Sequence, residues 1–472
     1  AYTFTWAGKE DAFRAIQTPS AASLRPAPEE SVNWDETRHL FIEGENLEVL
    51  KLLYKSYFGK VKMIYIDPPY NTGNDFIYRD DYSEPRRAYL EKTGQMDAEG
   101  NVLTSNPETS GRYHSDWLMM MYPRLFLARQ LLREDGVIFV SIDDNEVYHL
   151  RLLMNEVFGE ENFVASLIWE KYFSVKSTAR HFSVNHEYIL VYARDSEIWE
   201  PELLPRTEEA DSRYGNPDGD PRGPWASGPL QARNYYSKGK YKVVSPSGRE
   251  FLPPTGTYWR VSQETFEELQ RDNRIWWGAD GQNVPRMKRF LSEVKQGMVP
   301  DTLWEYEDAG HTQEAKEDLL EVVDFQHAEN VLRTLKPTRL IARMLKIGTD
   351  GGAGDIVLDF FAGSASAADA ILRQNREDGG NRRFIMVQFP EQLPEPEPHL
   401  DTIADVARMR IRRVIENIEA GEQEQLGLRP HEDLGFKVFR LAPSTFRQWE
   451  PPEGDGAEAL EEQLALFDRG LE

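Results

Sequence analysis

The stretch VKMIYIDPPY, residues 61–70, changes character abruptly after its sixth residue. Its first part is bulky and apolar, which is typical of a buried strand. Two consecutive prolines then remove two backbone donors and fix two φ angles, and they push Asp67 towards an extended conformation. The sequence therefore predicts a strand that ends in a rigid bracket of one carboxylate, two carbonyl groups and the ring of Tyr70.

Helical and apolar strand-like patterns alternate on both sides of this stretch. Helices are predicted at 45–57, 115–135 (with Pro123 as a kink and Asp135-Gly136 as its end), 143–159, 336–348, 364–375 and 402–420. Further strands are predicted at 137–142, 187–193, 355–361 and 383–389, and a Pro-rich connector at 393–401. Such alternation is typical of a parallel α/β sheet. It lapses between residues 195 and 325, so we predict that an insert larger than an ordinary loop interrupts one α/β domain.

Composition narrows the class of protein. The 472 residues have a formal net charge of −25 and no cysteine. A negative field argues against nonspecific adhesion to nucleic acid, but a local basic groove can still bind it because charges beyond about 10 Å are largely screened. Without cysteine there are no disulfides, thiolate zinc sites or cysteine nucleophiles, and we predict no metal site. We find no membrane span and no signal segment, so we expect a cytoplasmic protein.

A second candidate site lies in DIVLDFFAGSASAADAIL, residues 355–372. An apolar strand ends at Asp359, and the small residues 362–365 precede a helix. Small residues there let a ligand approach the backbone and the helix N-terminus, and ligands of open α/β sheets bind at the carboxyl ends of strands. The stretch lacks the full GxGxxG pattern, and the chain has no GxxxxGK[ST] motif, so a phosphate-cradling NTPase loop is not supported.

The bracket at residues 67–70 fits an amino group on a heteroaromatic ring. Such an amino group is a poor nucleophile, because its lone pair is delocalised into the ring. A site that uses it should accept both amino hydrogens, here with the Asp67 carboxylate and the Pro68 carbonyl, while Tyr70 stacks on the ring. Because the amino group of a base cannot be reached inside a duplex, the base has to be flipped out or already single-stranded.

The two motifs, DPPYNTG and DFFAGSAS, resemble motifs IV and I of amino-methyltransferases that use S-adenosylmethionine. Their order along the chain resembles the β class of DNA methyltransferases. Further stretches extend the resemblance to the modification (Mod) subunits of type III restriction–modification systems. These stretches are GRYHSDWLMMMYPRLFLARQLLREDGVIFVSIDDNEV (111–147), NRIWWGADGQNVPRMKRFLSEVKQG (273–297), KPTRLIARML (336–345) and EDGGNRRFIMVQFPE (377–391).

The resemblance implies a Rossmann-like fold with a mostly parallel sheet, interrupted by a target-recognition domain. It implies five parts: an N-terminal extension (1–35), the first part of the methyltransferase domain (36–194), the target-recognition domain (195–325), the second part (326–420) and a C-terminal segment (421–472). It also implies site residues. The catalytic ones are Asp67, Pro68, Pro69 and Tyr70; those at the cofactor are Asp359, Phe360, Ala362, Gly363, Ser364, Lys336, Thr338, Glu45, Asn46 and Gln388. The chain departs from the family pattern at Ala365, where a second glycine is usual, and at Gln388, where many methyltransferases have a ribose-binding acid.

Basic residues gather in three stretches in or beside the insert, at 171–186, 231–242 and 285–295. Phosphate neutralisation and base stacking need such islands in an acidic chain. The predicted DNA contacts are Lys176, Arg180, Lys238, Lys240, Arg286 and Lys288. The recognition sequence itself does not follow from the chain, because base contacts depend on geometry.

Together these features predict methyl transfer from S-adenosylmethionine to adenine N6 of a flipped base in double-stranded DNA. Cytosine C5 is excluded by the missing cysteine, whereas cytosine N4 stays open, as do RNA and a protein glutamine amide. A stand-alone β-class enzyme and a recognition subunit that does not methylate are further alternatives. By family, we expect a homodimer and a restriction (helicase/nuclease) subunit as partner.

Overall fold

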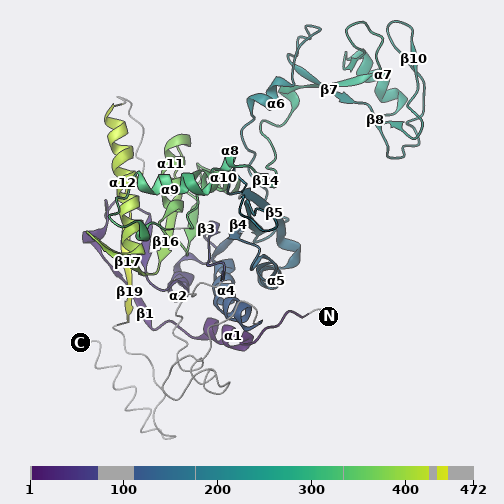
Figure 1. The fold of residues 1–472 in the computed structure, drawn as a ribbon. Coiled ribbons are helices and arrows are strands. Elements are labelled where there is room, and N and C mark those ends of the chain that lie inside the picture. The colour runs from purple at the N-terminus through teal and green to yellow at the C-terminus, as the bar shows by residue number, and fades with distance from the viewer. Residues whose placement is uncertain (1–2, 73–110, 176, 333, 425–432, 445–472) are drawn as a thin grey trace. The chain divides into compact units, whose positions relative to one another are not determined.

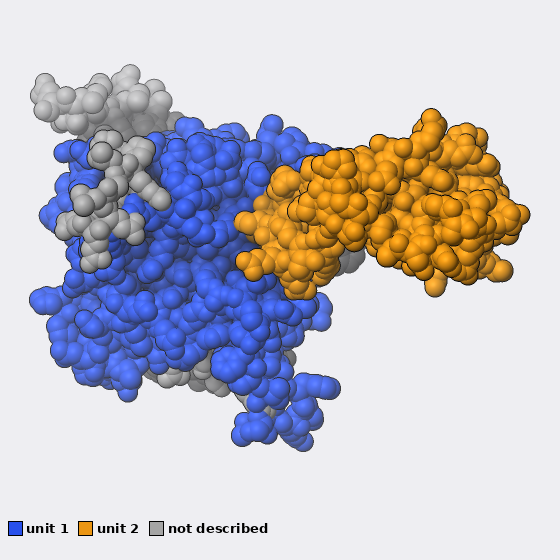
Figure 2. All heavy atoms as spheres, turned by 90° about the horizontal axis from the view of Figure 1, so that it is seen from above, with its two compact units in different colours: residues 1–202, 301–472 blue, residues 203–300 orange. Residues whose placement is uncertain are grey.

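We describe the fold from a computed structural model of the chain, for residues 3–72, 111–175, 177–332, 334–424 and 433–444. Lys176 and the part of the DPPY region after residue 72 lie outside these ranges. The chain forms two compact units, one of Ala1–Glu202 and Asp301–Glu472 and one of Leu203–Pro300 (Figure 2). The second unit lies within the insert predicted at 195–325, whereas residues 301–325 belong to the first unit.

A ten-stranded sheet organises the first unit, in the order β1-β19-β2-β16-β15-β3-β4-β6-β5-β14 (Figure 1). The strands are β1 Ala22–Pro26, β2 Leu40–Glu43, β3 Val61–Ile66, β4 Leu132–Ile142, β5 Phe163–Glu170, β6 His186–Ala193, β14 Leu303–Trp304, β15 Ile356–Asp359, β16 Arg383–Gln388 and β19 Lys437–Pro443. The central run from β19 to β4 is parallel throughout. In the part of the sheet that the structure describes, β1 and β6 run opposite to the other strands. The predicted mostly parallel α/β sheet is confirmed.

The two chain ends contribute to this sheet. Residues 22–26, predicted as part of an extension, form β1, and residues 437–443, predicted as part of a separate segment, form β19. The two strands pair with each other, and β19 also pairs with β2. Residues 22–26 and 437–443 are therefore part of the α/β domain.

Helices cover both faces of the sheet. The first unit contains α1 Lys9–Gln17, α2 Asn46–Tyr57, α4 Gly111–Leu131, α5 Val147–Phe158, α8 Tyr306–Ala309, α9 Thr312–Leu320, α10 Thr338–Gly348, α11 Ser366–Asp378 and α12 Ile403–Glu424. Side chains of a strand alternate between the faces. Ile64 and Ile66 of β3 pack with α2, α4 and α5 in one core cluster. Met63 lies on the other face, against Gly348 at the end of α10. Among the helices of the described residues, none is long and apolar enough to cross a membrane.

Two predicted boundaries were wrong. The helix predicted at 115–135 ends at Leu131, and β4 begins at Leu132, because the sheet pairing of β3 with β4 reaches back to Val61 and Leu132. The Pro-rich connector predicted at 393–401 is a small hairpin of β17 (Gln392–Glu397) and β18 (Leu400–Thr402). Its paired positions are at the non-proline ends, in keeping with the missing N–H of proline.

The second unit has small sheets and its own core. Its elements are α6 Glu208–Ser212, β7 Trp225–Pro229, β8 Gln231–Ala232, β9 Val243–Val244, β10 Glu250–Phe251, β11 Tyr258–Trp259, α7 Gln263–Arg271, β12 Ile275–Trp276 and β13 Arg286–Phe290. A cluster around Trp259, Phe266 and Trp277 is buried within it. A separate core is what distinguishes a domain from a long loop.

Candidate active site

Two strand ends define the site. The strands β3 and β15 are parallel neighbours, with Ile64 beside Leu358. Their carboxyl ends therefore meet at the same edge of the sheet, and each ends in an acid, Asp67 after β3 and Asp359 on β15. The structure thus brings together the two motifs that the sequence predicted to form one site.

A buried lysine binds the Asp67 carboxylate. The Nζ atom of Lys336, just before α10, lies 2.8 Å from each oxygen of Asp67. The lysine side chain is 5% exposed and that of Asp67 is 19% exposed. The same ammonium lies 3.4 Å from Glu187 on β6. One cation thus pairs with two carboxylates, and the Asp67 side chain, at 19%, is more exposed than that of Glu187, at 10%.

Tyr70 is fixed by the same group of residues. Its hydroxyl oxygen lies 2.7 Å from Asp67 Oδ1 and 3.1 Å from Glu187 Oε2, and it shares its proton between them. The Lys336 ammonium lies 5.0 Å from the centre of the tyrosine ring, a cation–π distance. The ring orientation is therefore set before any substrate arrives.

The electrostatics favour the charged forms of Lys336 and Glu187, whereas burial and the neighbouring Glu187 raise the pKa of Asp67 although Lys336 opposes them. Burial would lower the pKa of Lys336, but Asp67 and Glu187 outweigh it and raise that pKa above its usual value. Burial would raise the pKa of Glu187, but Lys336 and Lys171 outweigh it and lower that pKa. Lys171 donates to Glu187 at 3.0 Å. A buried charge is tolerable when it is paired in this way.

The two prolines differ in their carbonyl partners. The indole N–H of Trp117 donates to the Pro69 carbonyl at 2.7 Å. Among the residues that the structure describes, no donor reaches the carbonyl oxygen of Pro68. Pro68 is buried and its carbonyl has no partner among the described residues, while Pro69 anchors the turn to α4.

The loop after β15 is tight and depends on two left-handed residues. Gly363 has φ 54° and Ala365 has φ 60°, immediately before α11. A Cβ atom built on Gly363 would meet only the Phe361 carbonyl oxygen, at 4.0 Å. The space beside this glycine is therefore open, which suits the close approach of a ligand to the backbone.

Three side chains predicted to touch the cofactor, those of Asn46, Gln388 and Ser364, brace this loop. Asn46 donates to the Phe360 carbonyl at 2.8 Å, and Gln388 accepts from the Gly363 N–H at 2.7 Å. The buried hydroxyl of Ser364 accepts from Arg410 at 3.1 Å. The N–H of Ala362 donates to Val387 on β16. These contacts fix the shape of the loop, so that its backbone is the surface offered to a ligand.

Two further predicted cofactor residues are engaged elsewhere. Glu45 accepts from the backbone N–H groups of Leu47 and Glu48 at the start of α2, and Arg124 donates to the same carboxylate at 2.6 Å. Thr338 donates its hydroxyl proton to Asp318 at 2.9 Å. Their contacts identify Glu45 as a helix cap and Thr338 as a link between α9 and α10.

Asp359 fits a cationic ligand. Its carboxyl is 3% exposed and accepts the Phe361 N–H at 2.9 Å. Burial raises the pKa of Asp359 to about 8, and the nearby Asp67 adds to this. A ligand that carries positive charge would stabilise the ionised form. The residues present therefore suit a cofactor that has an ammonium and a sulfonium group.

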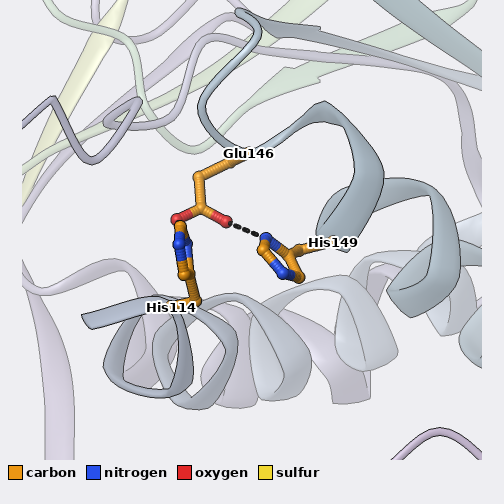
Figure 3. A group of neighbouring side chains, drawn as sticks. All are labelled: His114, Glu146 and His149. Carbon is orange, nitrogen blue, oxygen red and sulfur yellow. Dashed lines mark hydrogen bonds and ion pairs between the residues drawn. The ribbon is translucent and has the colours of Figure 1, made fainter. Parts of the chain in front are cut away.

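A second network holds the residue that follows the bracket. Asn71 has φ 58°, and its amide donates to Glu146 at 2.6 Å. Figure 3 shows the Glu146 carboxylate between the rings of His114 from α4 and His149 from α5, at 2.6 and 2.9 Å. These three side chains are donors that a transition metal accepts, and their ligand atoms lie within 4.8 Å of one another. Hydrogen bonds already engage both carboxylate oxygens, and through Asn71 the network fixes the turn.

Sequence reasoning missed Glu187, Lys171, Trp117 and Glu146. The signal at Glu187 was an acid inside the otherwise apolar strand 187–193, because a buried carboxylate requires a partner. No comparable pattern marks Trp117 on α4 or Glu146 before α5, since each acts through a residue distant in sequence.

The predicted DNA contacts divide into exposed and buried side chains. Arg180, Lys238, Lys240 and Arg286 are exposed. Lys288 is 1% exposed and binds Asp218 and Asp220 in the core of the second unit. This buried ion pair disfavours a phosphate contact by Lys288, whose DNA contact stays a prediction. Basic character in the stretch 285–295 did not distinguish a structural ion pair from a surface charge.

Comparison with known proteins agrees with this geometry. The family model described as DNA methylase matches residues 61–393. The StyLTI Mod subunit of Salmonella typhimurium is 35% identical, covering 94% of this chain and 67% of its own length. The EcoP15I Mod subunit of Escherichia coli is 30% identical (94% and 71%), and the EcoPI Mod subunit of Escherichia phage P1 is 32% identical (93% and 71%).

The matched family model thus defines a DNA methylase. The chain belongs to the family of Mod subunits of type III restriction–modification enzymes.

Proposed function

We propose that this chain transfers a methyl group to adenine N6 of a flipped base in double-stranded DNA. The observation that carries the proposal is the hydrogen-bonded cluster of Asp67, Lys336, Glu187 and Tyr70 at the end of β3, beside the open loop at Gly363. An amino group needs acceptors and a fixed ring, and this cluster supplies both.

Asp67 and Pro68 would hold the two amino hydrogens. Oxygen Oδ1 of Asp67 already accepts from Lys336 and Tyr70, whereas Oδ2 accepts from Lys336. Oδ2 therefore keeps a lone pair for one amino hydrogen, and the Pro68 carbonyl accepts the other. Both bonds pull electron density towards the amino nitrogen, and they strengthen as the nitrogen becomes positive in the transition state.

S-adenosylmethionine supplies an electrophilic methyl group: the amino nitrogen bonds to the methyl carbon as the carbon–sulfur bond breaks, and its electrons remain on sulfur. The residues that would hold the cofactor are Asp359, whose carboxylate would pair with the positive charge of the cofactor, and the backbone of residues 360–364. Lys336, Asn46 and Gln388 act as positioning residues in this proposal. Asp67 takes up the amino proton through its hydrogen bond, so catalysis rests mainly on positioning.

Recognition of the DNA sequence belongs, in this proposal, to the unit Leu203–Pro300. It has its own core, and its exposed Lys238, Lys240 and Arg286 suit phosphate contacts. Arg180 of the first unit, and Lys176, are the further predicted phosphate contacts. Relatives are subunits of restriction–modification enzymes, so we also propose a restriction subunit as partner and a homodimer as the working form.

Cytosine N4 is the second candidate target, because its amino group poses the same chemical problem and the matched family model is named for both. A stand-alone methyltransferase would use the same site without a restriction subunit. A recognition subunit that does not methylate is disfavoured by the complete cluster around Asp67.

The test uses S-adenosylmethionine with a labelled methyl group, mixed-sequence duplex DNA and mass spectrometry of the digested nucleosides. We expect label in N6-methyladenine, and mapping of the modified positions gives the recognition sequence. Label in N4-methylcytosine would change the base but keep the site. Label absent from DNA, although the cofactor binds, would overturn the proposal.

The matched variants are Asp67→Ala and Asp350→Ala. Asp350 is an exposed acid before β15, at the opposite edge of the sheet. We expect the Asp67 variant to bind cofactor and DNA but to lose transfer, and the Asp350 variant to keep it. Normal turnover by Asp67→Ala would remove this residue from the site.

A further inference from the structure

One loop beside the active site exposes apolar side chains that the mechanism above does not use. We name it the β5–β6 loop, residues 171–185, which joins β5 to β6. Phe182 is 89% exposed, Val175 76%, Phe173 62% and Val184 48%. Single exposed apolar residues are common, but four on one short loop mark a contact surface.

The loop is attached to the active site at both ends. At its neck the N–H of Lys171 donates to the Asn185 carbonyl at 2.8 Å. The Lys171 ammonium binds Glu187, and Glu187 in turn contacts the Tyr70 hydroxyl. Phe182 precedes Glu187 by five residues, so their Cα atoms are within roughly 18 Å of each other. A molecule held at Tyr70 is thus within reach of this loop.

The charge of the loop selects the partner. Residues 171–186 contain two lysines, one arginine and two histidines but no acid, in a chain with a net charge of −25. Arg180 and His181 are exposed beside Phe182. Exposed apolar side chains next to cationic ones suit a polyanion whose interior consists of flat apolar rings. DNA is such a polyanion, with phosphates outside and stacked bases inside.

Base flipping creates the need for such a loop. Removing a base from a duplex costs stacking and pairing energy and leaves a gap between its neighbours. Proteins that distort duplexes insert apolar side chains between base steps to fill such gaps. A phenylalanine that already stands in solvent has no contacts to lose when it enters the stack.

We propose that the β5–β6 loop is a wedge that enters the DNA duplex at the target site, with Phe182 filling the space left by the flipped base. The proposal rests on DNA methylation as proposed above and assigns the step before it. Arg180 would hold a flanking phosphate, and Phe173 supports the base of the loop by its ring contact with His311, at 5.3 Å.

The test compares Phe182→Ala with the unchanged chain on two duplexes that contain the mapped recognition sequence. In one the target base is paired, and in the other it faces an abasic site, so that it leaves the stack at lower cost. We expect Phe182→Ala to lower kcat/KM at least tenfold on the paired duplex and less than threefold on the abasic one. Phe182→Leu, which keeps an apolar wedge, should recover most of the loss.

Phe58→Ala is the matched control. Phe58 is 52% exposed and lies after α2, at the sheet edge opposite to Asp67. The Phe58→Ala variant should methylate both duplexes as efficiently as the unchanged chain. With 2-aminopurine as the target base, the fluorescence gained on binding should fall for Phe182→Ala and not for Phe58→Ala.

Three results would overturn the wedge. The first is that Phe182→Ala retains full kcat/KM on the paired duplex. The second is that kcat/KM falls by the same factor on both duplexes, which would indicate a general contact with DNA. The third is that Phe182→Ala keeps full activity but converts a dimer into a monomer, which would assign the loop to an interface between copies of the chain. If the unchanged chain methylates neither duplex, the proposed function itself fails and the wedge with it.

Discussion

The ammonium of Lys336 lies 2.8 Å from both carboxylate oxygens of Asp67, although the two residues are 269 positions apart in the chain. One comes from the segment before the inserted unit and the other from the segment after it. The ion pair therefore joins the two halves of the α/β domain at the point where the substrate amino group would bind. Stability and function are coupled at this pair.

Replacing Lys336 by methionine tests this coupling. The change leaves Asp67 and Glu187 buried without their shared cation, which costs about 3–5 kcal/mol of the free energy of unfolding. Urea unfolding should show this loss, and methyl transfer should fall with it. A loss below about 1 kcal/mol would mean that the pair is not a structural link.

Lys346→Met is the control, because Lys346 lies on α10, the helix that follows Lys336, and forms a partly exposed pair with Glu377 at 3.1 Å. Exposed pairs contribute about 0–1 kcal/mol. Adding Asp67→Asn to Lys336→Met should restore part of the lost stability, since it removes one unpaired buried charge.

Asp359 should make stability depend on pH. Its pKa is about 8 in the folded chain, because of burial, and about 3.9 in an unfolded one. The folded chain binds the extra proton between these values, so the stabilising contribution is complete below pH 4 and is lost as the pH rises through about 8. Asp359→Asn should remove this loss and be more stable than the unchanged chain at pH 9, by at least about 1 kcal/mol. Unfolding curves of both proteins at pH 6 and pH 9 measure this difference. If the free energy of unfolding changes equally with pH in both proteins, the prediction is contradicted.

The same carboxyl predicts how cofactor affinity changes with pH. A cationic ligand binds the ionised form, so affinity for S-adenosylmethionine should rise from pH 6 to pH 8 in the unchanged chain. In Asp359→Asn the affinity should be lower and nearly constant over that interval. Calorimetric titration gives both curves.

The sequence was sufficient to locate both strand ends. The apolar runs before Asp67 and before Asp359 are local patterns, and a parallel sheet brings their carboxyl ends together. It was not sufficient to pair Lys336 with Asp67, because that contact depends on how α10 packs on the sheet. Lys288 shows the converse limit: its basic neighbours suggested a surface, whereas Asp218 and Asp220, about 70 positions earlier, hold it inside.

The sheet edges were also beyond local patterns. β1 has no fully buried residue, and β19 is only partly buried, so neither shows the apolar run of a central strand. They become strands by pairing with each other across almost the whole length of the chain.

The loop after β15 offers two substitutions with opposite expected signs. Gly363→Ala should cost about 1 kcal/mol, although a Cβ has space there, because φ 54° strains any other residue. Ala365→Gly relieves the same strain at φ 60° but removes a buried methyl group, so stability should stay level or rise by up to about 1 kcal/mol. Thermal unfolding of the two variants distinguishes them, and a loss in both would mean that packing decides at both positions.

Charge reversal tests the interface of the second unit. Lys238 and Lys240 are exposed, and the Lys240 ammonium lies 5.2 Å from the ring centre of Tyr258. If both contact phosphates, Lys238→Glu with Lys240→Glu should weaken binding to every duplex by a similar factor. It should also reduce the slope of log K against log salt by about 2, since each phosphate contact contributes about 0.9.

The matched control carries the same charge change on Lys55 and Lys60. Both are exposed and precede β3, at the sheet edge opposite to the active site. Replacing them by glutamate lowers the net charge equally, so any effect of the overall field appears in both double variants. A salt slope that falls only for the Lys238 and Lys240 pair identifies direct contacts. Equal slopes in the two variants would remove this patch from the DNA interface and leave Arg180 and Arg286 as the cations to test next.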